Sequence, residues 1–204
     1  MSVAAIVLAA GLGSRFGETP KLLAELDGEP LVRRVAQAAV ASRADPVMVV
    51  LGRAAAAVRA ALDGLPITFV DNPDYAQGLS TSLKAGFAAL PGDAAGAVVC
   101  LGDMPLLGAD VLDALIAAFA ETPDAAAIVP VHAGRRGNPV LLARRLAPEI
   151  AGLSGDRGAG PLLKGRADVR ELPWGDDRVL VDVDTPEALA ALGSPLSLVE
   201  RGRG

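Results

Sequence analysis

Apolar runs of strand length alternate along this chain with segments whose apolar residues recur at helical spacing. The first run, residues 3–9, is apolar at every position, as expected for a parallel strand buried on both faces. Further strands are expected at 47–51, 67–70, 97–101, 126–131, 139–142, 169–172 and 179–183, and helices at 31–40, 53–62, 78–90, 110–120, 143–151, 158–164 and 185–192. This alternation predicts a three-layer α/β/α, Rossmann-like fold with a mainly parallel, mixed sheet.

The length of 204 residues suits one domain of this class. Apolar residues make up 51% of the chain and aromatic residues only 3%, so the core must consist mainly of Ala, Val, Leu and Ile. We expect a single domain over residues 1–192. The remaining residues, 193–204, contain Gly, Ser and Arg and are expected to form a flexible tail.

Charge and cysteine content speak against several classes of protein. The net charge is −5 and the 19 basic residues are scattered, which argues against nucleic acid as a partner. Cys100 is the only cysteine, so no disulfide forms within the chain, and its apolar neighbours predict a buried thiol. Residues 1–10 are too few to span a membrane and lack the basic start of a signal peptide, so a cytoplasmic protein is expected. No heptad pattern stands out, and we therefore expect a monomer.

A glycine-rich loop follows the first expected strand, where α/β sheets commonly bind ligands. It reads L-A-A-G-L-G-S-R-F-G over residues 8–17, and Lys21 follows. Glycines let backbone N–H groups approach an anion, while Arg15 and Lys21 can hold a triphosphate and stabilise a phosphoryl transition state. Glu18 after Gly17 breaks the Walker A pattern, and Phe16 breaks the dinucleotide fingerprint. An ordinary strand–helix turn with solvated basic residues remains the alternative for this loop.

Aspartates follow two other expected strands. Asp103 comes just past residues 97–101, where a carboxylate can bind Mg²⁺ that bridges a triphosphate. Asp184 follows residues 179–183 in the same way. Each has a simpler interpretation, because either residue could cap the turn or helix that comes next. Asp182 is expected to point to the opposite face of its strand and ranks below Asp184 as a ligand.

Three polar segments complete the set of candidate binding residues. Residues 72–82 (N-P-D-Y-A-Q-G-L-S-T-S) form a turn and a helix start, whose backbone and hydroxyl groups could read a nucleotide base or simply cap the helix. Residues 134–140 (G-R-R-G-N-P-V) and 153–159 (L-S-G-D-R-G-A) lie on expected turns. His132, the only histidine, is expected to be structural.

Taken together and in order, these segments resemble the molybdenum cofactor cytidylyltransferase family, whose signature is a strand followed by L-A-[AG]-G, R-[MFL]-G and P-K or D-K. The resemblance covers nearly the whole chain. Residues 72–82 resemble the nucleotide-binding segment of that family and residues 101–105 (L-G-D-M-P) the metal-binding segment. The last matching motif is D-V-D-T-P-E at residues 182–187.

The resemblance implies a nucleotidyltransferase fold and Mg²⁺-dependent transfer of CMP from CTP to the phosphate of molybdenum cofactor. It implies catalytic roles for Lys21, Arg15 and Asp103, and metal binding by Asp103 and Asp184. Acceptor binding would fall to Asn138, Arg136 and Asp156. The nucleotide-binding residues would be Leu8, Ala9, Ala10, Gly11, Gly13, Ser14, Arg15, Lys21, Asn72, Gly78, Ser80 and Ser82. The expected partners are CTP, molybdenum cofactor and a recipient molybdoenzyme.

The choice of CTP over GTP depends on small differences within the family. Ala10 stands where the guanylyltransferase branch usually has glycine, which favours CTP. Residues 18–20 separate Gly17 from Lys21, although the cytidylyltransferase branch often has two residues there. Three other functions stay open: transfer to another phosphorylated acceptor or from GTP, a related oxidoreductase, and a binding protein that delivers the cofactor.

Overall fold

The computed structural model describes residues 2–11, 16 and 20–193, and its main sheet contains eight strands. Seven of them lie in the order β10-β7-β9-β6-β1-β4-β5, and β8 pairs with β7. Only β8 and β9 pair antiparallel to their neighbours, which confirms the mainly parallel, mixed sheet. The strands are β1 (Ser2–Ala9), β4 (Val47–Leu51), β5 (Thr68–Asp71), β6 (Ala94–Leu101), β7 (Ala127–His132), β8 (Arg135–Arg136), β9 (Val140–Ala143) and β10 (Val169–Pro173).

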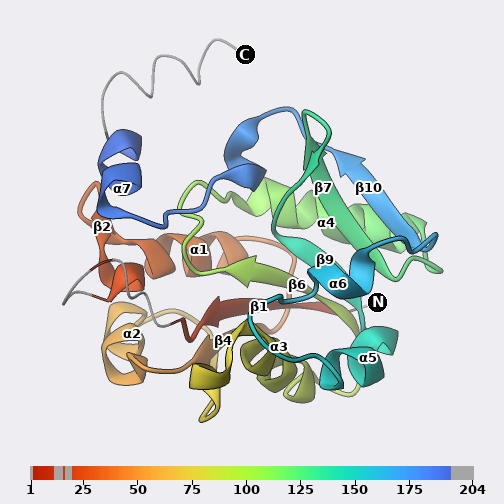
Figure 1. The fold of residues 1–204 in the computed structure, drawn as a ribbon, viewed down its shortest axis with the longest axis horizontal. Coiled ribbons are helices and arrows are strands. Elements are labelled where there is room, and N and C mark those ends of the chain that lie inside the picture. Colours follow the sequence, from red (N-terminus) through yellow and green to blue (C-terminus); the bar gives the residue numbers. More distant parts are fainter. Residues whose placement is uncertain (1, 12–15, 17–19, 194–204) are drawn as a thin grey trace.

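Helices cover both faces of this sheet, so the three-layer prediction is confirmed (Figure 1). One core cluster contains buried residues of α1 (Leu31–Val40), α2 (Ala55–Ala61) and α4 (Ala109–Glu121). The other contains buried residues of α3 (Leu79–Ala88), α5 (Ala147–Ala151) and α6 (Gly160–Leu163). The central strand β1 supplies both clusters, because its side chains alternate between the two faces.

Close packing between α3 and the sheet depends on a glycine. A Cβ atom at Gly86 would lie 2.6 Å from Cγ2 of Ile6, a residue of β1 that is fully buried. The helix can therefore approach the sheet only because this position carries no side chain. The contact fixes α3 against the strand whose end carries the glycine-rich loop.

A small third cluster holds the C-terminal helix α7 (Pro186–Leu192) against the rest of the fold. Buried Leu26, Leu31 and Val183 form it, and Leu189 and Leu192 of α7 pack on them. Leu26 belongs to a short hairpin of β2 (Glu25–Leu26) and β3 (Glu29–Pro30), and α7 lies near β2 in Figure 1. This packing brings the D-V-D-T-P motif next to the sheet.

The sequence-based prediction was wrong at residues 179–183, where no strand forms. The chain makes a 3₁₀ helix over Asp177–Leu180 and then continues without pairing to the sheet. The hairpin of β2 and β3 was missed, although Asp27 and Gly28 are a typical pair for a tight hairpin turn. Both have positive φ angles, 55° and 79°, as such turns require.

Among the described residues, no helix combines the length and apolar character needed to cross a bilayer. The expected tail falls mostly on residues 194–204, which lie outside the described residues. The expectation of one domain over residues 1–192 stays a prediction.

Candidate functional site

A cleft of about 670 Å³ opens where the central strands β1 and β6 end. Its volume lies within the range of small-molecule sites in proteins, and its position is the one that α/β sheets commonly use. Acidic, basic and apolar groups all face it. The lining residues are Leu8, Ala10, Gly11, Lys21, Leu22, Tyr75, Ala76, Gly78, Leu79, Ser82, Leu101, Gly102, Asp103, Asp156, Asp182 and Asp184.

Glycine at position 102 keeps β1 and β6 together at the edge of the cleft. Its backbone N–H donates to the carbonyl of Leu8 across 3.1 Å. A Cβ atom there would lie 2.9 Å from that same carbonyl oxygen, so a side chain would force the two strands apart. The next residue, Asp103, is thereby held beside the end of β1.

Lys21 links two of the predicted metal-binding residues. Its Nζ lies 2.5 Å from Oδ2 of Asp103 and 2.7 Å from Oδ1 of Asp184. The side chains of Lys21 and Asp103 are largely buried, at 14% and 18% exposure, whereas Asp184 is 53% exposed. The structure therefore brings together residues that lie 163 positions apart in the sequence.

Asp184 does not act as the cap of the helix that follows it. The side chain of Thr185 is the N-cap of α7 and accepts a hydrogen bond from the N–H of Ala188 across 3.2 Å. Pro186 occupies the first turn of the helix, where it is well tolerated. The carboxylate of Asp184 instead faces the cleft and contacts Lys21.

Asp182 joins the same group, which corrects its low rank in the sequence analysis. One carboxylate oxygen each from Asp103, Asp182 and Asp184 lies within 4.8 Å of the others. Residues 181–184 are extended but unpaired, and side chains two positions apart in an extended segment point to the same side. Val183 between them is fully buried, and its N–H donates to the carbonyl of Asp103 across 2.9 Å. This anchor turns both flanking aspartates toward the cleft.

Charge and burial shift the pKa values of two groups in the cleft. Partial burial lowers the pKa of Lys21, but the charges and hydrogen bonds of Asp103 and Asp184 outweigh it and raise the pKa overall. Burial, followed by the charges of Asp103 and Asp184, raises the pKa of Asp182. Lys21 is therefore a firmly protonated cation at neutral pH, surrounded by carboxylates.

The acidic group fits a divalent metal ion. Oδ1 of Asp103 is buried and has no hydrogen-bond partner among the described residues. Carboxylate oxygens are the ligands that Mg²⁺ prefers, and a bound ion would satisfy such an oxygen. Asp103, Asp182 and Asp184 are the residues that could hold the ion.

Asn72 lies beneath one wall of the cleft, the loop from β5 to α3, and holds it together. Its side-chain nitrogen donates to the hydroxyls of Thr81 and Ser82 at 2.9 and 3.1 Å, and its oxygen accepts from the N–H of Asp74 at 3.0 Å. It is 5% exposed and does not line the cleft. Ser80 is also buried and outside the lining, whereas Gly78 and Ser82 face the cleft as predicted.

Asp156 closes this wall by contacting the start of α3. Its Oδ1 accepts from the N–H of Leu79 at 3.2 Å, and the N–H of Ser80 donates to the carbonyl of Gly155 at 3.1 Å. A Cβ atom at Gly78, whose φ is 112°, would lie 2.6 Å from Oδ1 of Asp156. The segments predicted to bind nucleotide and acceptor therefore touch each other at this point.

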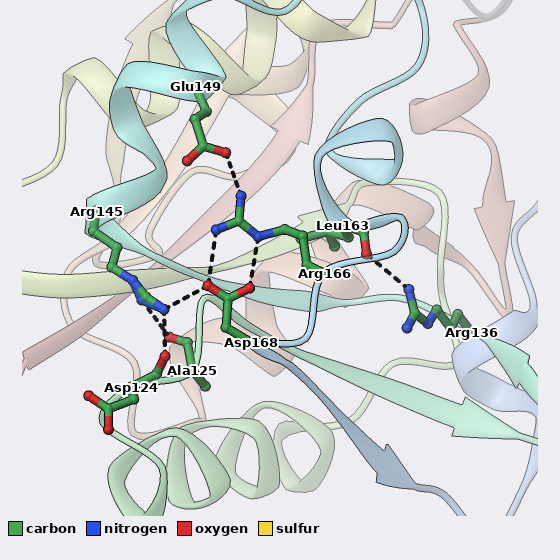
Figure 2. A network of polar contacts seen from close by, with 8 residues as sticks. All are labelled: Asp124, Ala125, Arg136, Arg145, Glu149, Leu163, Arg166 and Asp168. Atoms are coloured by element: carbon green, nitrogen blue, oxygen red, sulfur yellow. Dashed lines mark hydrogen bonds and ion pairs between the residues drawn. The ribbon is translucent and has the colours of Figure 1, made fainter.

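The other two predicted acceptor residues do not line the cleft. Figure 2 shows the side chain of Arg136 directed at the carbonyl of Leu163, a contact of 3.3 Å. The same side chain pairs with Glu171 at 2.8 Å. The backbone N–H of Asn138 donates to the carbonyl of Val179 at 2.8 Å.

His132 and Cys100 have the structural surroundings expected from the sequence. Nδ1 of His132 lies 2.9 Å from the carbonyl oxygen of Trp174, away from the cleft. Cys100 is fully buried in β6, and this burial raises the pKa of its thiol to about 12. Neither group is placed to react with a ligand in the cleft.

Some predicted nucleotide-binding residues cannot be placed. Gly13, Ser14 and Arg15 lie outside the described residues. Leu8, Ala10 and Gly11 line the cleft, and Ala9 points to the other core cluster. Six lining residues were not predicted individually. Tyr75, Ala76 and Leu79 belong to the predicted nucleotide-binding segment 72–82, Leu101 and Gly102 belong to segment 101–105, and Leu22 directly follows Lys21.

Comparison with known proteins identifies the family of this chain. Residues 5–171 match the model of a MobA-like NTP transferase domain. A nicotine blue oxidoreductase of Paenarthrobacter nicotinovorans is 31% identical over 202 residues, which is 93% of this chain and 96% of that protein.

Solved structures with a similar fold include two from mycobacteria. An Rv0371c homologue from Mycobacterium sp. strain JC1 is 35% identical with a TM-score of 0.81, over 97% of each chain. Rv0371c of Mycobacterium tuberculosis H37Rv, solved in complex with manganese, is 32% identical with a TM-score of 0.77, over 94% of this chain and 98% of that one. The chain thus belongs to the family of MobA-like NTP transferase domains, a nucleotidyltransferase family.

Proposed function

We propose that this protein transfers CMP from CTP to the phosphate of molybdenum cofactor and releases pyrophosphate. The observation that carries the proposal is the contact of Lys21 with Asp103 and Asp184 at the ends of β1 and β6. At this position the ammonium supplies positive charge for a triphosphate, and the two carboxylates supply ligands for the metal ion bound to it. The family supports nucleotidyl transfer in general, while CTP and molybdenum cofactor follow from the sequence motifs.

Mg²⁺ is the proposed metal ion, held by Asp103 and Asp184 with Asp182 beside them. When bound, such an ion neutralises phosphate charge and polarises the reacting phosphoryl group. The manganese complex of Rv0371c supports a divalent ion in this family. The carboxylates of this chain would hold the ion at the triphosphate end of the cleft.

The contacts around α3 favour one orientation of the nucleotide. Its first N–H groups, those of Leu79 and Ser80, already donate to Asp156 and to the carbonyl of Gly155. They are therefore poor candidates to hold phosphate. The triphosphate is proposed to lie at Gly11 and Lys21, and the base beside Tyr75, Gly78 and Ser82 at the other end.

The proposed chemistry is an in-line displacement at the α-phosphorus of CTP. A phosphate oxygen of the acceptor attacks and forms a new P–O bond, while the bond from the α-phosphorus to the β-phosphate oxygen breaks. Pyrophosphate leaves with that electron pair. Lys21, with Arg15 as predicted from the sequence, would stabilise the charge that develops on the phosphoryl oxygens. No histidine base is needed, because an ionised phosphate is already a nucleophile.

Asp156 is the acceptor-side residue that the geometry favours most. It lines the cleft at the junction of the two binding segments, whereas Arg136 and Asn138 lie outside the lining. A carboxylate oxygen accepts hydrogen bonds from N–H groups of the kind that a pterin carries. A role for Arg136 or Asn138 would concern a part of the acceptor that extends beyond the cleft.

Pyrophosphate release tests this proposal. The purified protein is supplied with Mg²⁺ and each of CTP, GTP, ATP and UTP, with and without molybdenum cofactor. Release with CTP that requires the cofactor is expected. Release with GTP alone among the nucleotides would retain the chemistry and contradict the base assignment. Absence of release with every nucleotide would contradict the proposal as a whole.

A related oxidoreductase is a second candidate, favoured by the 31% identity to nicotine blue oxidoreductase. The loop after β1 lacks the dinucleotide fingerprint, because Phe16 stands at the third glycine position. Oxidation of NADH or NADPH with a pigment substrate, followed at 340 nm, would support this function. Flavin absorbance in the purified protein would support it as well.

A further inference from the structure

Lys21 occupies the place between two carboxylates that a divalent cation needs. Its ammonium group lies 2.5 Å from Oδ2 of Asp103 and 2.7 Å from Oδ1 of Asp184. A metal ion bound to either oxygen of these two carboxylates would lie only a few ångströms from the ammonium, since carboxylate oxygens bind Mg²⁺ at about 2.1 Å. The ammonium and the ion therefore compete for the same two carboxylates, because two cations so close together repel each other.

We propose that Lys21 serves as a built-in counter-ion of the nucleotide-free protein and must leave Asp103 and Asp184 before a metal ion can bind them. The proposal rests on the proposed function only in that it assigns these carboxylates to a divalent metal. It adds an order to the binding events. The triphosphate gives Lys21 a new anionic partner, so that nucleotide and metal assist each other's binding.

The surroundings of Lys21 explain why the ammonium stays in place until it is exchanged. The side chain is 14% exposed, so an ammonium that left the carboxylates without finding another partner would be an unpaired charge in a partly buried site, which costs free energy. The carboxylates also raise its pKa, so at neutral pH it does not leave by losing its proton. Only a competing cation or a competing anion can separate the three groups.

The chain can move the ammonium without moving the backbone. Lys21 starts a short 3₁₀ helix over Lys21–Leu23, which is fixed by buried Leu22 and by the N–H of Leu23 donating to the carbonyl of Pro20 at 2.8 Å. The side chain has four flexible carbons and a compact charged head. It can therefore swing from the carboxylates toward a phosphate across the same cleft.

Mn²⁺ binding to the nucleotide-free protein gives the first test. Free Mn²⁺ is measured by electron paramagnetic resonance for wild type, Lys21→Met and, as control, Lys164→Met at an exposed position outside the cleft. Lys21→Met is expected to bind Mn²⁺ tighter than wild type, on the order of tenfold. Lys164→Met is expected to match wild type. Equal or weaker binding by Lys21→Met would overturn the proposal.

Nuclear magnetic resonance of the wild-type protein gives a second test that needs no variant to fold. The chain has only three lysines, Lys21, Lys84 and Lys164, so protein labelled with ¹³C at the lysine ε-carbon gives three resolvable signals. Saturating Mg²⁺ is expected to shift the Lys21 signal and leave the other two unchanged. Bound Mg²⁺ with an unshifted Lys21 signal would overturn the proposal, because the ammonium would then have stayed in place.

Both measurements are made without nucleotide or acceptor. Their outcome is therefore separate from the outcome of the pyrophosphate assay. A protein that exchanges Lys21 for metal but releases no pyrophosphate would contradict the proposed function and retain the exchange. If the wild-type protein releases pyrophosphate but Lys21→Met gains no affinity for Mn²⁺, the proposed function is retained and the exchange of Lys21 for metal is contradicted.

Discussion

Asp103 connects the separate parts of the candidate site. Its Oδ2 contacts Lys21, its backbone carbonyl accepts the N–H of Val183, and its buried Oδ1 has no hydrogen-bond partner among the described residues. The contact of Oδ2 holds the ammonium of Lys21, and the hydrogen bond from Val183 holds Asp182 and Asp184 in place. The unpartnered Oδ1 is available to bind a ligand. All three features belong to one residue, which comes just after β6.

Asp182 is expected to destabilise the metal-free protein at neutral pH. Burial and the charges of Asp103 and Asp184 raise its pKa above the ordinary value of 3.8, so its ionised form is disfavoured in the folded state. Replacing it in Asp182→Asn should therefore raise the free energy of unfolding at pH 7 relative to wild type, by less than about 1 kcal/mol in this solvent-accessible site.

The sign of this change in the free energy of unfolding can be checked by urea unfolding of both proteins in a chelating buffer between pH 3 and pH 7. The destabilisation caused by Asp182 is absent at a pH below 3.8, where its carboxyl is protonated in the folded and in the unfolded protein. It grows as the pH rises through the raised pKa of the folded state. The difference between Asp182→Asn and wild type should widen over that range. A difference that stays constant with pH would contradict the repulsion among the three carboxylates.

At the scale of elements, the loop from β5 to α3 is shaped by one buried side chain and one glycine. Asn72 holds Asp74, Thr81 and Ser82, and Gly78 allows the turn of 153–159 to approach. The wall of the cleft is therefore assembled from two segments that are distant in sequence.

Gly78→Ala is expected to disturb this wall more than a matched glycine substitution. Gly78 and Gly64 both have positive φ angles, 112° and 81°, but only a Cβ atom at Gly78 would meet another segment. Through backbone strain, alanine should lower the free energy of unfolding by about 1 kcal/mol at Gly64 and by about 1–3 kcal/mol at Gly78, whose ψ of 173° places it in a region that essentially only glycine adopts. Gly78→Ala should lose more stability than Gly64→Ala and should alone raise the KM for nucleotide. Equal effects of the two substitutions would show that the contact with Asp156 is unimportant.

A network of charged residues joins the start of β10 to α5 and to the 3₁₀ helix before it (Figure 2). Arg166 donates to both oxygens of Asp168 at 2.9 and 3.0 Å and contacts Glu149 at 2.6 Å, while Arg145 contacts Asp168 at 3.1 Å. Arg166 is thus held from two sides. The hydrogen bonds of Arg166, above all, lower the pKa of Asp168.

Asp168→Asn is expected to destabilise the protein with the opposite pH dependence to Asp182→Asn. A lowered folded-state pKa means that the stabilisation is present above the ordinary pKa of 3.8 and is lost as the pH falls through the folded-state value. Urea unfolding should show a constant deficit from pH 5 to pH 7 that shrinks as the pH approaches 3. A deficit that persists unchanged at low pH would contradict this explanation.

Regular elements could be predicted from the sequence because their patterns are local. The run in β1 and the helical spacing in α1 and α4 identified those elements with small errors at their ends. Residues 179–183 failed because an apolar run alone does not show whether a partner strand lies beside it. Their two buried side chains instead make separate long-range contacts: Val179 packs in one of the main core clusters, and Val183 packs on Leu26 and Leu31.

The candidate site was predicted in part for the same reason. Asp103 comes just after β6 and Lys21 comes after the loop that follows β1, and the ends of parallel strands meet at one edge of a sheet. Asp184 was predicted by the same reasoning, although its expected strand does not form. The role of Asp182 depends on an unpaired segment, and the supporting role of Asn72 depends on hydrogen bonds beneath the surface. The spacing of Asp182, two positions before Asp184, does indicate that both side chains lie on one side of an extended segment, whereas the role of Asn72 has no such signature.

At the scale of the whole molecule, the main sheet of the described residues is continuous and has a core cluster on each face. We therefore predict that residues 1–192 unfold as a single domain. Fluorescence of Trp174, the only tryptophan, and far-ultraviolet circular dichroism should give coincident thermal transitions. Trp174 lies next to β10 at one edge of the sheet, so separate transitions would show that this edge unfolds independently and would contradict the prediction.

The transfer of label from CTP to the acceptor tests the central claim most directly. Wild type and Asp103→Asn are incubated with Mg²⁺, molybdenum cofactor and CTP labelled with ³²P at the α-phosphate, after circular dichroism has shown that both are folded. Wild type should transfer the label to the cofactor, and Asp103→Asn should do so about 10²- to 10³-fold more slowly, as for loss of one group that stabilises a transition state. Equal transfer by Asp103→Asn, or none by wild type with labelled CTP, would contradict the account.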